Sequence, residues 1–458
     1  MGAEFYSALP ANPPADLALI IDNRELREQI GLTDEDLKKI QSYCLNPDAN
    51  DFDTFAMVYA GHQFGQFVNQ LGDGRGIFLG QTNHDYDLHL KGAGKTPYSR
   101  FGDGRAVLRS SIREYIASEV MNNLNIPSTR AVALFISEEK VLRDSYEPSA
   151  VLLRSSQSHI RFGHFEFFHY RNKSKQVKKL ADYAIENYFL FNENAEEPYV
   201  NFFQTVVQKT AQMISKWQGV GFCHGVMNTD NFSILGETFD YGPYAFMESL
   251  NPEFICNTSD YEGRYRYSNQ PYIGLWNCSA LGEALKTLIP EAKIEEILKT
   301  YEQEFSSNLR KIYLYKLGLT EHQPGDDELI QDYLSLISNE NLDYTQSFRT
   351  LVKIIQEEYL IKGSGSLEKW KKRFLKRHEF EKSDLRNRLD MMKSINPHIT
   401  PKNFQIQKVI DAVEKGNYEA LHNFCDAFKN PFEENSKTQI FDEVPCENEA
   451  NIRTSCSS

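Results

Sequence analysis

The stretch from His224 to Gly242 constrains this chain most, because it sets metal-ligating and acid–base side chains at fixed spacings. It reads HGVMNTDN, then eight residues, then Asp240-Tyr-Gly. Asn231 and Asp240 carry oxygen atoms of the kind that Mg²⁺ or Mn²⁺ prefers beside phosphate oxygens. Asp230, directly before Asn231, is either a general base for an incoming hydroxyl or a turn residue, as Asp often is in such sequences. The stretch predicts a metal-dependent nucleotide site.

The same spacings occur, with one difference, in the catalytic segment of kinase-type enzymes. There a His opens the loop, an Asp two positions later accepts the hydroxyl proton, an Asn seven positions after the His holds a metal, and a later Asp-x-Gly holds the metal on the phosphates. His224, Asn231 and Asp240 are in register. Val226 stands at the position of the base and cannot accept a proton. The pattern favours ATP chemistry other than ordinary phosphorylation, with His224 in a structural role.

Upstream, a glycine-rich loop, a lysine and a glutamate follow one another in the order of a kinase N-lobe. Gly72, Gly74 and Gly76 alternate in LGDGRG (71–76), where the absence of Cβ atoms lets backbone N–H groups approach phosphate. Alone, such a triplet is more often a turn. Lys91 ends an expected strand, and Glu114 lies near the middle of an expected helix, off its apolar stripe. In kinases this Lys–Glu pair positions the phosphates, so the ordered set predicts a nucleotide-binding lobe.

Two further motifs carry candidate phosphate contacts. FGDGRA places Asp103 and Gly104 just before a helix, where they form either a nucleotide-facing turn or a turn with a capping Asp. Arg154 and Arg161 lie seven positions apart in a polar segment. Two such arginines clamp a polyphosphate through forked hydrogen bonds, or pair with surface carboxylates.

The hydrophobic periodicity predicts an α+β, protein-kinase-like bilobal fold, with a β-rich N-lobe that holds one key helix and a mostly helical C-lobe with an extra helical C-terminal region. Short apolar or alternating stretches predict strands, and apolar residues at every fourth position from 108 to 124 predict a helix over 106–124. The expected strands are 77–81, 85–91, 131–135 and 150–154, and the expected later helices are 279–318, 327–339, 343–361, 366–393 and 404–429.

The expected organisation has four parts. Residues 1–50 form a lead-in with one short helix after a cap at Thr33, and residues 51–175 form the ATP-binding N-lobe. Residues 176–430 form the helical C-lobe and extension, interrupted by a loop region over 222–278. Residues 431–458 form a flexible acidic tail that ends in Cys-Ser-Ser.

Composition excludes several classes of protein. A net charge of −14 argues against non-specific nucleic-acid binding, which needs clustered Lys and Arg. The seven cysteines form no CxxC motif, so zinc or iron–sulfur ligand spacing is absent. KGAGKT is not a phosphate-binding P-loop, because His89 stands where that motif needs a glycine. The N-terminus has neither a secretory nor an organelle-targeting composition, and no apolar run spans a bilayer. We expect a cytoplasmic, bacterial, monomeric protein without a membrane or nucleic-acid partner.

Long strings of this sequence resemble the selenoprotein O (YdiU) family. They include LGDGRG, DLHLKGAGKTPYSRFGDGRAVLRSSIREYI, RSSQSHIRFGHFEFF and HGVMNTDNFSILGETFDYGPYAFM. The resemblance is dense over residues 50–280 and loose over the helical remainder. It implies a kinase-like fold that binds ATP inverted relative to kinases and transfers AMP, with release of pyrophosphate, to Ser, Thr or Tyr hydroxyls of proteins.

The resemblance also implies roles for individual residues. Asp230 would accept the proton, Asn231 and Asp240 would hold Mg²⁺ or Mn²⁺, and Glu114 would pair with Lys91. The residues that would contact ATP are Gly72, Gly74, Arg75, Lys91, Asp103, Gly104, Arg154, Arg161 and Asp240.

A pair of cysteines is a candidate redox switch. Cys256 follows the metal segment, and Cys456 stands near the C-terminus, where eukaryotic members of the family carry selenocysteine. A disulfide between them would pin the tail across the catalytic segment. The alternative is two cysteines that never meet, since Cα atoms more than about 7 Å apart cannot be bridged without movement.

The sequence therefore predicts a metal-dependent protein adenylyltransferase. The first alternative is a conventional protein or small-molecule kinase, against which Val226 counts. The second is a catalytically silent, ATP-binding pseudokinase scaffold, against which the full set of metal and base residues counts.

Overall fold

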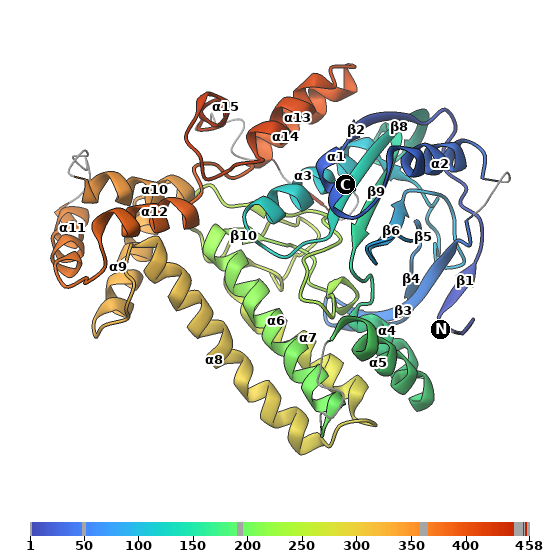
Figure 1. Cartoon of the computed structure of the whole chain (residues 1–458), viewed down its shortest axis with the longest axis horizontal. Helices are drawn as coiled ribbons and strands as arrows, with labels where there is room; N and C mark the ends of the chain where they lie inside the picture. Colours follow the sequence, from blue (N-terminus) through green and yellow to red (C-terminus); the bar gives the residue numbers. More distant parts are fainter. Residues whose placement is uncertain are drawn as a thin grey trace.

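The N-terminal part of the computed structural model is an antiparallel sheet, coloured blue to teal in Figure 1. The structure describes residues 2–47, 52–189, 196–356, 365–443, 452, 454 and 455. The strand order is β1-β3-β5-β6-β9-β8-β2, with β4 paired to β3 and β7 to β9. The strands are β1 (Tyr6–Ala8), β2 (Ala18–Asp22), β3 (Phe55–Gln63), β4 (Gln66–Gly72), β5 (Gly76–Gln81), β6 (Asp87–Lys91), β7 (Ala106–Val107), β8 (Arg130–Leu142) and β9 (Tyr146–Ser156).

Helix α3 (Leu108–Asn123) covers one face of this sheet. Its predicted stripe is confirmed: Leu108, Ile112 and Ile116 are fully buried and pack in one cluster with residues of β8 and β9. The four predicted strands are also confirmed, although β8 and β9 extend well beyond 131–135 and 150–154. Because Lys91 ends β6 and α3 crosses behind the sheet, this packing sets the distance between the lysine and the helix.

The N-terminal residues 2–47 form more helices and strands than the single helix predicted for this part of the chain. The helix after Thr33 exists as α2 (Asp34–Leu45), with the capping box between Thr33 and Asp36. A second helix, α1 (Arg24–Gln29), precedes it, and β1 and β2 join opposite ends of the sheet. Leu26, Ile30 and other residues of α1 and α2 pack on the sheet face opposite α3. The prediction of one helix was wrong here because three- to six-residue elements show too little periodicity.

The remainder of the chain is mostly helical, as predicted, and the α+β fold class is confirmed. Three predicted helices are each two: 279–318 is interrupted before Pro290, 366–393 between residues 378 and 385, and 404–429 between residues 414 and 419. The helices are α4 (Phe162–His169), α5 (Ser174–Tyr188), α6 (Pro198–Val220), α7 (Gln270–Leu285), α8 (Glu291–Lys316), α9 (Asp326–Asn339), α10 (Tyr344–Ile355), α11 (Gly365–His378), α12 (Leu385–Ile395), α13 (Asn403–Glu414), α14 (Glu419–Ala427) and α15 (Ser436–Gln439). None of the helices in the described ranges is both long enough and apolar enough to cross a membrane.

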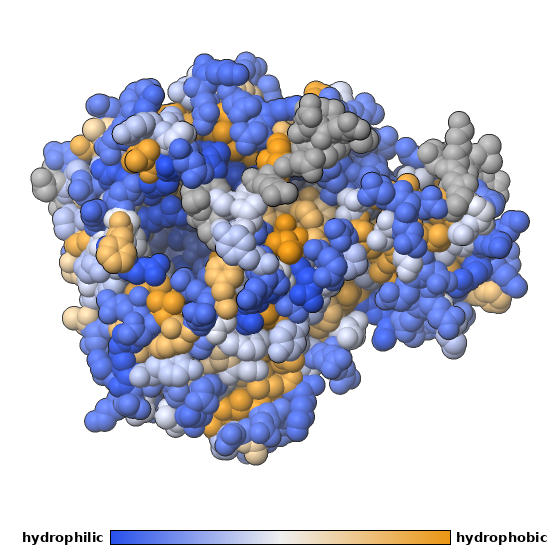
Figure 2. Space-filling model, turned by 180° about the vertical axis from the view of Figure 1, so that it is seen from behind, coloured by the Kyte–Doolittle hydropathy of each residue, from blue (hydrophilic) through white to orange (hydrophobic). Residues whose placement is uncertain are grey.

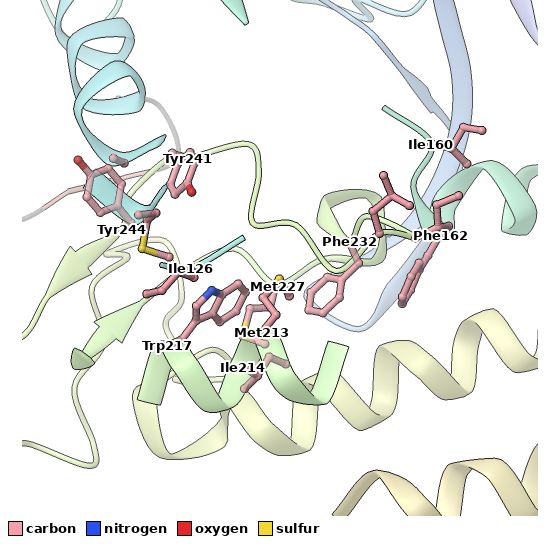
Figure 3. Packing of buried hydrophobic residues seen from close by; sticks show 14 of the residues in the cluster. Ile126, Ile160, Phe162, Met213, Ile214, Trp217, Met227, Phe232, Tyr241 and Tyr244 are labelled. Atoms are coloured by element: carbon pink, nitrogen blue, oxygen red, sulfur yellow. The ribbon is translucent and has the colours of Figure 1, made fainter. Parts of the chain in front are cut away.

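A hydrophobic core beneath residues 224–242 holds that segment in place. Trp217 on α6, Met227 and Phe232 belong to one hydrophobic cluster (Figure 3), and all three are almost completely buried. The Trp217 indole Nε1 donates to Thr238 Oγ1 at 2.8 Å. Between α6 and α7, the small sheet of β10 (Phe222–Cys223) and β11 (Ala245–Phe246) closes the ends of the segment. The 222–278 region is thus irregular but firmly packed.

Candidate active site

A cavity of about 620 Å³ lies between the sheet and the 226–243 segment. On the face shown in Figure 2, the half of the molecule that contains the sheet is hollowed, and the visible wall of the hollow is hydrophilic. The cavity brings together nearly all of the predicted site residues, from six separate parts of the sequence. Those that line it are Gly72, Gly74, Arg75, Lys91, Asp103, Gly104, Glu114, Arg154, Asp230, Asn231 and Asp240. Arg161 and Cys256 do not line it, and Cys456 lies outside the described residues.

Lys91 and Glu114 form the ion pair that their order in the sequence predicted. Lys91 Nζ contacts Glu114 Oε2 and lies 3.6 Å from Asp240 Oδ1. Arg154 Nη1 donates to Glu114 Oε1 at 3.0 Å and to Asp240 Oδ1 at 2.6 Å. Burial lowers the pKa of Lys91, and the charges of Glu114 and Asp240 oppose that shift. The result is a buried cluster of cations and carboxylates at one wall of the cavity.

Asp240 is held at the centre of this cluster. Its Oδ2 accepts from Arg161 Nη1 at 2.7 Å, so each carboxylate oxygen has an arginine partner. Burial would raise the pKa of Asp240, but Arg154 and Arg161 outweigh it and hold that pKa well below its usual range. The backbone of Asp240 has φ of 58°, a left-handed conformation that costs an L-residue about 1–2 kcal/mol. The carboxylate is therefore anionic and held by its surroundings, as a metal ligand must be.

The two arginines differ in their access to the cavity. Arg161 is 1% exposed, and its guanidinium lies between the rings of Tyr59 and Phe239, 4.5 and 4.3 Å from their centroids. Its Nη1 also donates to the backbone oxygen of Asp230 at 2.9 Å. Arg161 thus ties the Asp230 loop to Asp240, whereas Arg154 lines the cavity. Arg75 also lines it, and its Nη1 donates a long hydrogen bond of 3.5 Å to the Arg105 carbonyl oxygen. Arg75 is therefore better placed than Arg161 to meet an anionic ligand.

Asp230 has the environment of a general base. It is 7% exposed, and burial raises its pKa to about 7, near the pH at which a base must accept a proton. Its Oδ2 accepts from Gln63 Nε2 at 3.3 Å. Its Oδ1 is buried and has no hydrogen-bond partner among the described residues. Asp230 therefore lines the cavity with a carboxylate that has an unused acceptor oxygen, which lies against Gly61 of β3.

The neighbours of Asp230 differ in the groups that they can offer to a ligand. Asn231 Nδ2 donates to the Val226 carbonyl oxygen at 3.0 Å, which leaves the amide oxygen free to meet a cation. Val226 lines the cavity with an apolar side chain. His224 is 1% exposed and its Nε2 hydrogen-bonds to the Phe239 carbonyl oxygen, and burial lowers its pKa to about 4. A neutral, enclosed imidazole fits the structural role expected of His224.

The donor set of Asn231 and Asp240 suits a hard divalent cation. The described residues contain no group of three or more His, Cys, Asp or Glu that could hold a metal. Mg²⁺ sites in phosphate-transferring enzymes commonly use one or two side-chain oxygens, with substrate phosphates and water completing the shell. The residues present therefore fit a metal that binds together with the nucleotide.

Gly72 of LGDGRG and Gly104 of FGDGRA are required by the packing of the protein itself. A Cβ on Gly72, whose φ is 146°, would lie 2.4 Å from the Tyr98 ring. Gly104, with φ of 75°, approaches the backbone of Gly94 so closely that a Cβ would lie 2.2 Å from its carbonyl carbon. Asp103 pairs with Arg143 through contacts of 2.7 and 3.0 Å, and this ion pair lowers its pKa. Asp103 does not cap α3, whose N-cap is Val107.

Sequence reasoning missed two residues that support Asp230, namely Gln63 and Glu166. Glu166 is fully buried in α4, where it accepts from Thr229 and contacts His62. A lone carboxylate inside the apolar string FGHFEFF was the available signal, since an unpaired charge is costly to bury. Gln63 gave no signal, because nothing local distinguishes a glutamine that faces a loop far away in the sequence.

Cys256 lies next to a described part of the tail. It is 6% exposed, and its Sγ donates to the Cys223 carbonyl oxygen at 3.4 Å. Thr454 forms a parallel bridge with Asn257, and its Oγ1 donates to the Cys256 carbonyl oxygen at 2.8 Å. The chain two residues before Cys456 therefore runs directly beside Cys256.

The comparisons with known proteins all point to one family. The sequence profile of a family described as "Protein adenylyltransferase SelO" matches residues 1–429. Proteins named "Protein nucleotidyltransferase YdiU" from Vibrio atlanticus and Vibrio cholerae are 40% and 41% identical to this chain, over 99% of it and 96% of each relative. A protein of the same name from Pseudomonas entomophila is 42% identical over 89% of this chain and 86% of the relative.

Proposed function

Because this chain belongs to the SelO family of protein adenylyltransferases, we propose that it transfers AMP from ATP to a Ser, Thr or Tyr hydroxyl of a protein, with release of pyrophosphate. The observation that carries the proposal is the Asp230 carboxylate. It lies in the cavity beside Asn231, with Oδ1 unpartnered and a pKa of about 7. Val226 offers no base at the kinase position, which counts against phosphoryl transfer by the usual route.

In the proposed reaction the ATP is inverted, so that its α-phosphate lies near Asn231 and Asp240. The acceptor hydroxyl gives its proton to the Asp230 carboxylate while its oxygen forms a bond to the α-phosphorus. The bond from the α-phosphorus to the α–β bridging oxygen breaks, and pyrophosphate leaves with that electron pair. Positioning and charge stabilisation supply most of the catalysis in such transfers.

The cations of the cavity would bind the other end of the nucleotide. Arg75, Lys91 and Arg154 line the cavity and carry positive charge suited to the β- and γ-phosphates. Glu114 fixes Lys91, and Gly72, Gly74 and Gly104 line the same cavity. Asp103 would contact the nucleotide only as part of the turn that its ion pair with Arg143 holds in place.

A divalent cation, Mg²⁺ or Mn²⁺, would be held by Asn231 and Asp240. When bound, it neutralises charge that develops on the phosphate oxygens. Binding would draw Asp240 away from Arg154, because that arginine occupies one of its oxygens. The freed Arg154 is then available to phosphate, so we expect metal and ATP to bind cooperatively.

We also propose that Cys256 and Cys456 form a redox pair. Support comes from Thr454, which lies beside Cys256 and ties the tail to the segment after Asp240. A peroxide oxidant would take two electrons from the two thiols as the S–S bond forms, leaving water, and a thiol reductant would reverse it. Peptide mapping after mild oxidation should yield the Cys256–Cys456 peptide, and Cys456→Ser should remove the oxidant sensitivity of activity. Absence of that peptide contradicts the pair.

The expected cellular setting stays a prediction: a cytoplasmic monomer whose partners are ATP and acceptor proteins, without nucleic acid or membrane. The proposed reaction is tested by incubating the enzyme with ATP, Mg²⁺ or Mn²⁺ and an extract of bacterial proteins. Mass spectrometry should find adenylate esters on hydroxyl side chains, with pyrophosphate released in proportion. Phosphate esters would indicate a kinase, and unmodified proteins with bound ATP would indicate a scaffold.

A further inference from the structure

Within the described ranges, Gln63 is the only side chain that donates a hydrogen bond to the Asp230 carboxylate. Its Nε2 donates to Oδ2 at 3.3 Å, while Oδ1 is buried without a partner. A carboxylate held by one oxygen presents the other in a fixed direction. The rotation of the Asp230 side chain, and hence which oxygen meets the acceptor hydroxyl, therefore depends on this glutamine.

The backbone on both sides of Gln63 is fastened to the residues just before Asp230. The His62 amide donates to Thr229 Oγ1 at 2.7 Å, and the Phe64 amide donates to Asn228 Oδ1 at 3.2 Å. The end of β3 and the 3₁₀ turn Thr229–Asn231 thus share a fixed register across 167 positions of sequence. Gln63 approaches Asp230 from a backbone that cannot slide relative to it.

Glu166 holds the same two segments together, the end of β3 and the turn Thr229–Asn231. Its Oε2 accepts from Thr229 Oγ1 at 2.5 Å, and its Oε1 lies 2.5 Å from His62 Nδ1. Glu166 is fully buried, so both oxygens must be satisfied by these partners. One carboxylate therefore joins the strand end to the loop that carries the base.

The strand passes so close to Asp230 that its sequence is constrained. A Cβ on Gly61 would lie 2.7 Å from Asp230 Oδ1. A Cβ on Gly163 of α4 would lie 2.1 Å from the Ala60 carbonyl oxygen. The absence of both Cβ atoms lets β3, α4 and the base loop meet without displacing the carboxylate.

We propose that Gln63 is a positioning residue for AMP transfer, which orients the Asp230 carboxylate so that it takes the proton of the acceptor hydroxyl. This inference rests on the proposed function, because it requires Asp230 to be the base. It predicts that loss of the Gln63 amide slows the chemical step while ATP still binds.

The test is a double-mutant cycle on the full-length enzyme. Gln63→Met keeps the length of the side chain and removes the donor. Single-turnover transfer of AMP from α-labelled ATP to proteins of a bacterial extract should fall about tenfold, since part of the general-base contribution depends on orientation. The Kd for ATP, measured by calorimetry, and the melting temperature should stay close to those of the parent protein. The matched control is Gln66→Met, at the solvent-exposed position that pairs with Gln63 across the hairpin, and it should change nothing.

The second arm separates this inference from the proposed function. In an Asp230→Asn background, Gln63→Met should cause no further loss, because coupled residues are not additive. An equal tenfold loss in both backgrounds overturns the positioning role, and so does a full-rate Gln63→Met enzyme beside an impaired Asp230→Asn enzyme. If Asp230→Asn itself keeps the full rate, the assignment of the base fails, and the inference fails with it.

Discussion

Replacing Arg154 and replacing Arg161 should have different effects, although both side chains contact the Asp240 carboxylate. Arg154 lines the cavity, whereas Arg161 is enclosed between Tyr59 and Phe239 and does not line it. We therefore expect Arg154→Met to weaken ATP binding and Arg161→Met to weaken the fold. The family resemblance, in contrast, implies that both arginines contact ATP.

The magnitudes follow from the contacts. A hydrogen bond to a charged group contributes about 1.5–3 kcal/mol, so Arg154→Met should raise the Kd for ATP by about tenfold to a hundredfold. The Kd for AMP, which lacks the β- and γ-phosphates, should change much less. Removing one partner of a buried ion pair costs about 3–5 kcal/mol of unfolding free energy, which is the loss expected for Arg161→Met.

Calorimetry with ATP and AMP, beside denaturant unfolding of the same preparations, measures both effects. A matched control is Arg143→Met, whose partner Asp103 is partly exposed and whose loss should cost little stability. The reasoning is refuted if Arg161→Met unfolds at the parent's denaturant midpoint but loses ATP affinity selectively. Equal losses of ATP and AMP affinity in Arg154→Met would show that it does not contact the terminal phosphates.

Three further predictions concern single carboxylates and one buried lysine. Asp230→Ala should keep ATP affinity in calorimetry but lower the transfer rate about a hundredfold or more, and collapsed ATP binding would contradict its role as base. Asp240→Ala should abolish metal-dependent nucleotide binding and transfer, and intact activity would contradict the metal assignment. Burial lowers the pKa of Lys316 from 10.5 to about 7, so between these values the unfolded chain holds more protons and stability rises with pH. The stability advantage of Lys316→Met over the parent should therefore shrink by about 2 kcal/mol from pH 7 to pH 9 in denaturant unfolding, and a constant difference would contradict that shift.

The parts of the site that follow from local sequence were predictable. Lys91 and Glu114 belong to a strand and a helix with strong periodicity, and their pairing follows once the helix packs on the sheet. The spacing of Asn231 and Asp240 is likewise local and brings both to one cavity.

What could not be predicted depends on contacts between distant segments. Arg161 looks like a phosphate ligand in sequence, but Tyr59 and Phe239 enclose it only in the folded protein. Gln63 and Glu166 reach the base loop from other elements, with no motif to mark them. The strands β1 and β2 are short segments whose partners lie elsewhere in the sheet, so their pattern carries little information.

The central claim is that AMP, and not phosphate, moves from ATP to protein. The most direct measurement uses ATP labelled separately at the α- and γ-phosphates, with the parent enzyme and the Asp240→Ala variant in parallel. We predict that protein-bound label comes from the α position only, requires Mg²⁺ or Mn²⁺, and is absent with the variant. Protein-bound label from the γ position would contradict the account and establish a kinase, and no bound label from either position would establish a scaffold.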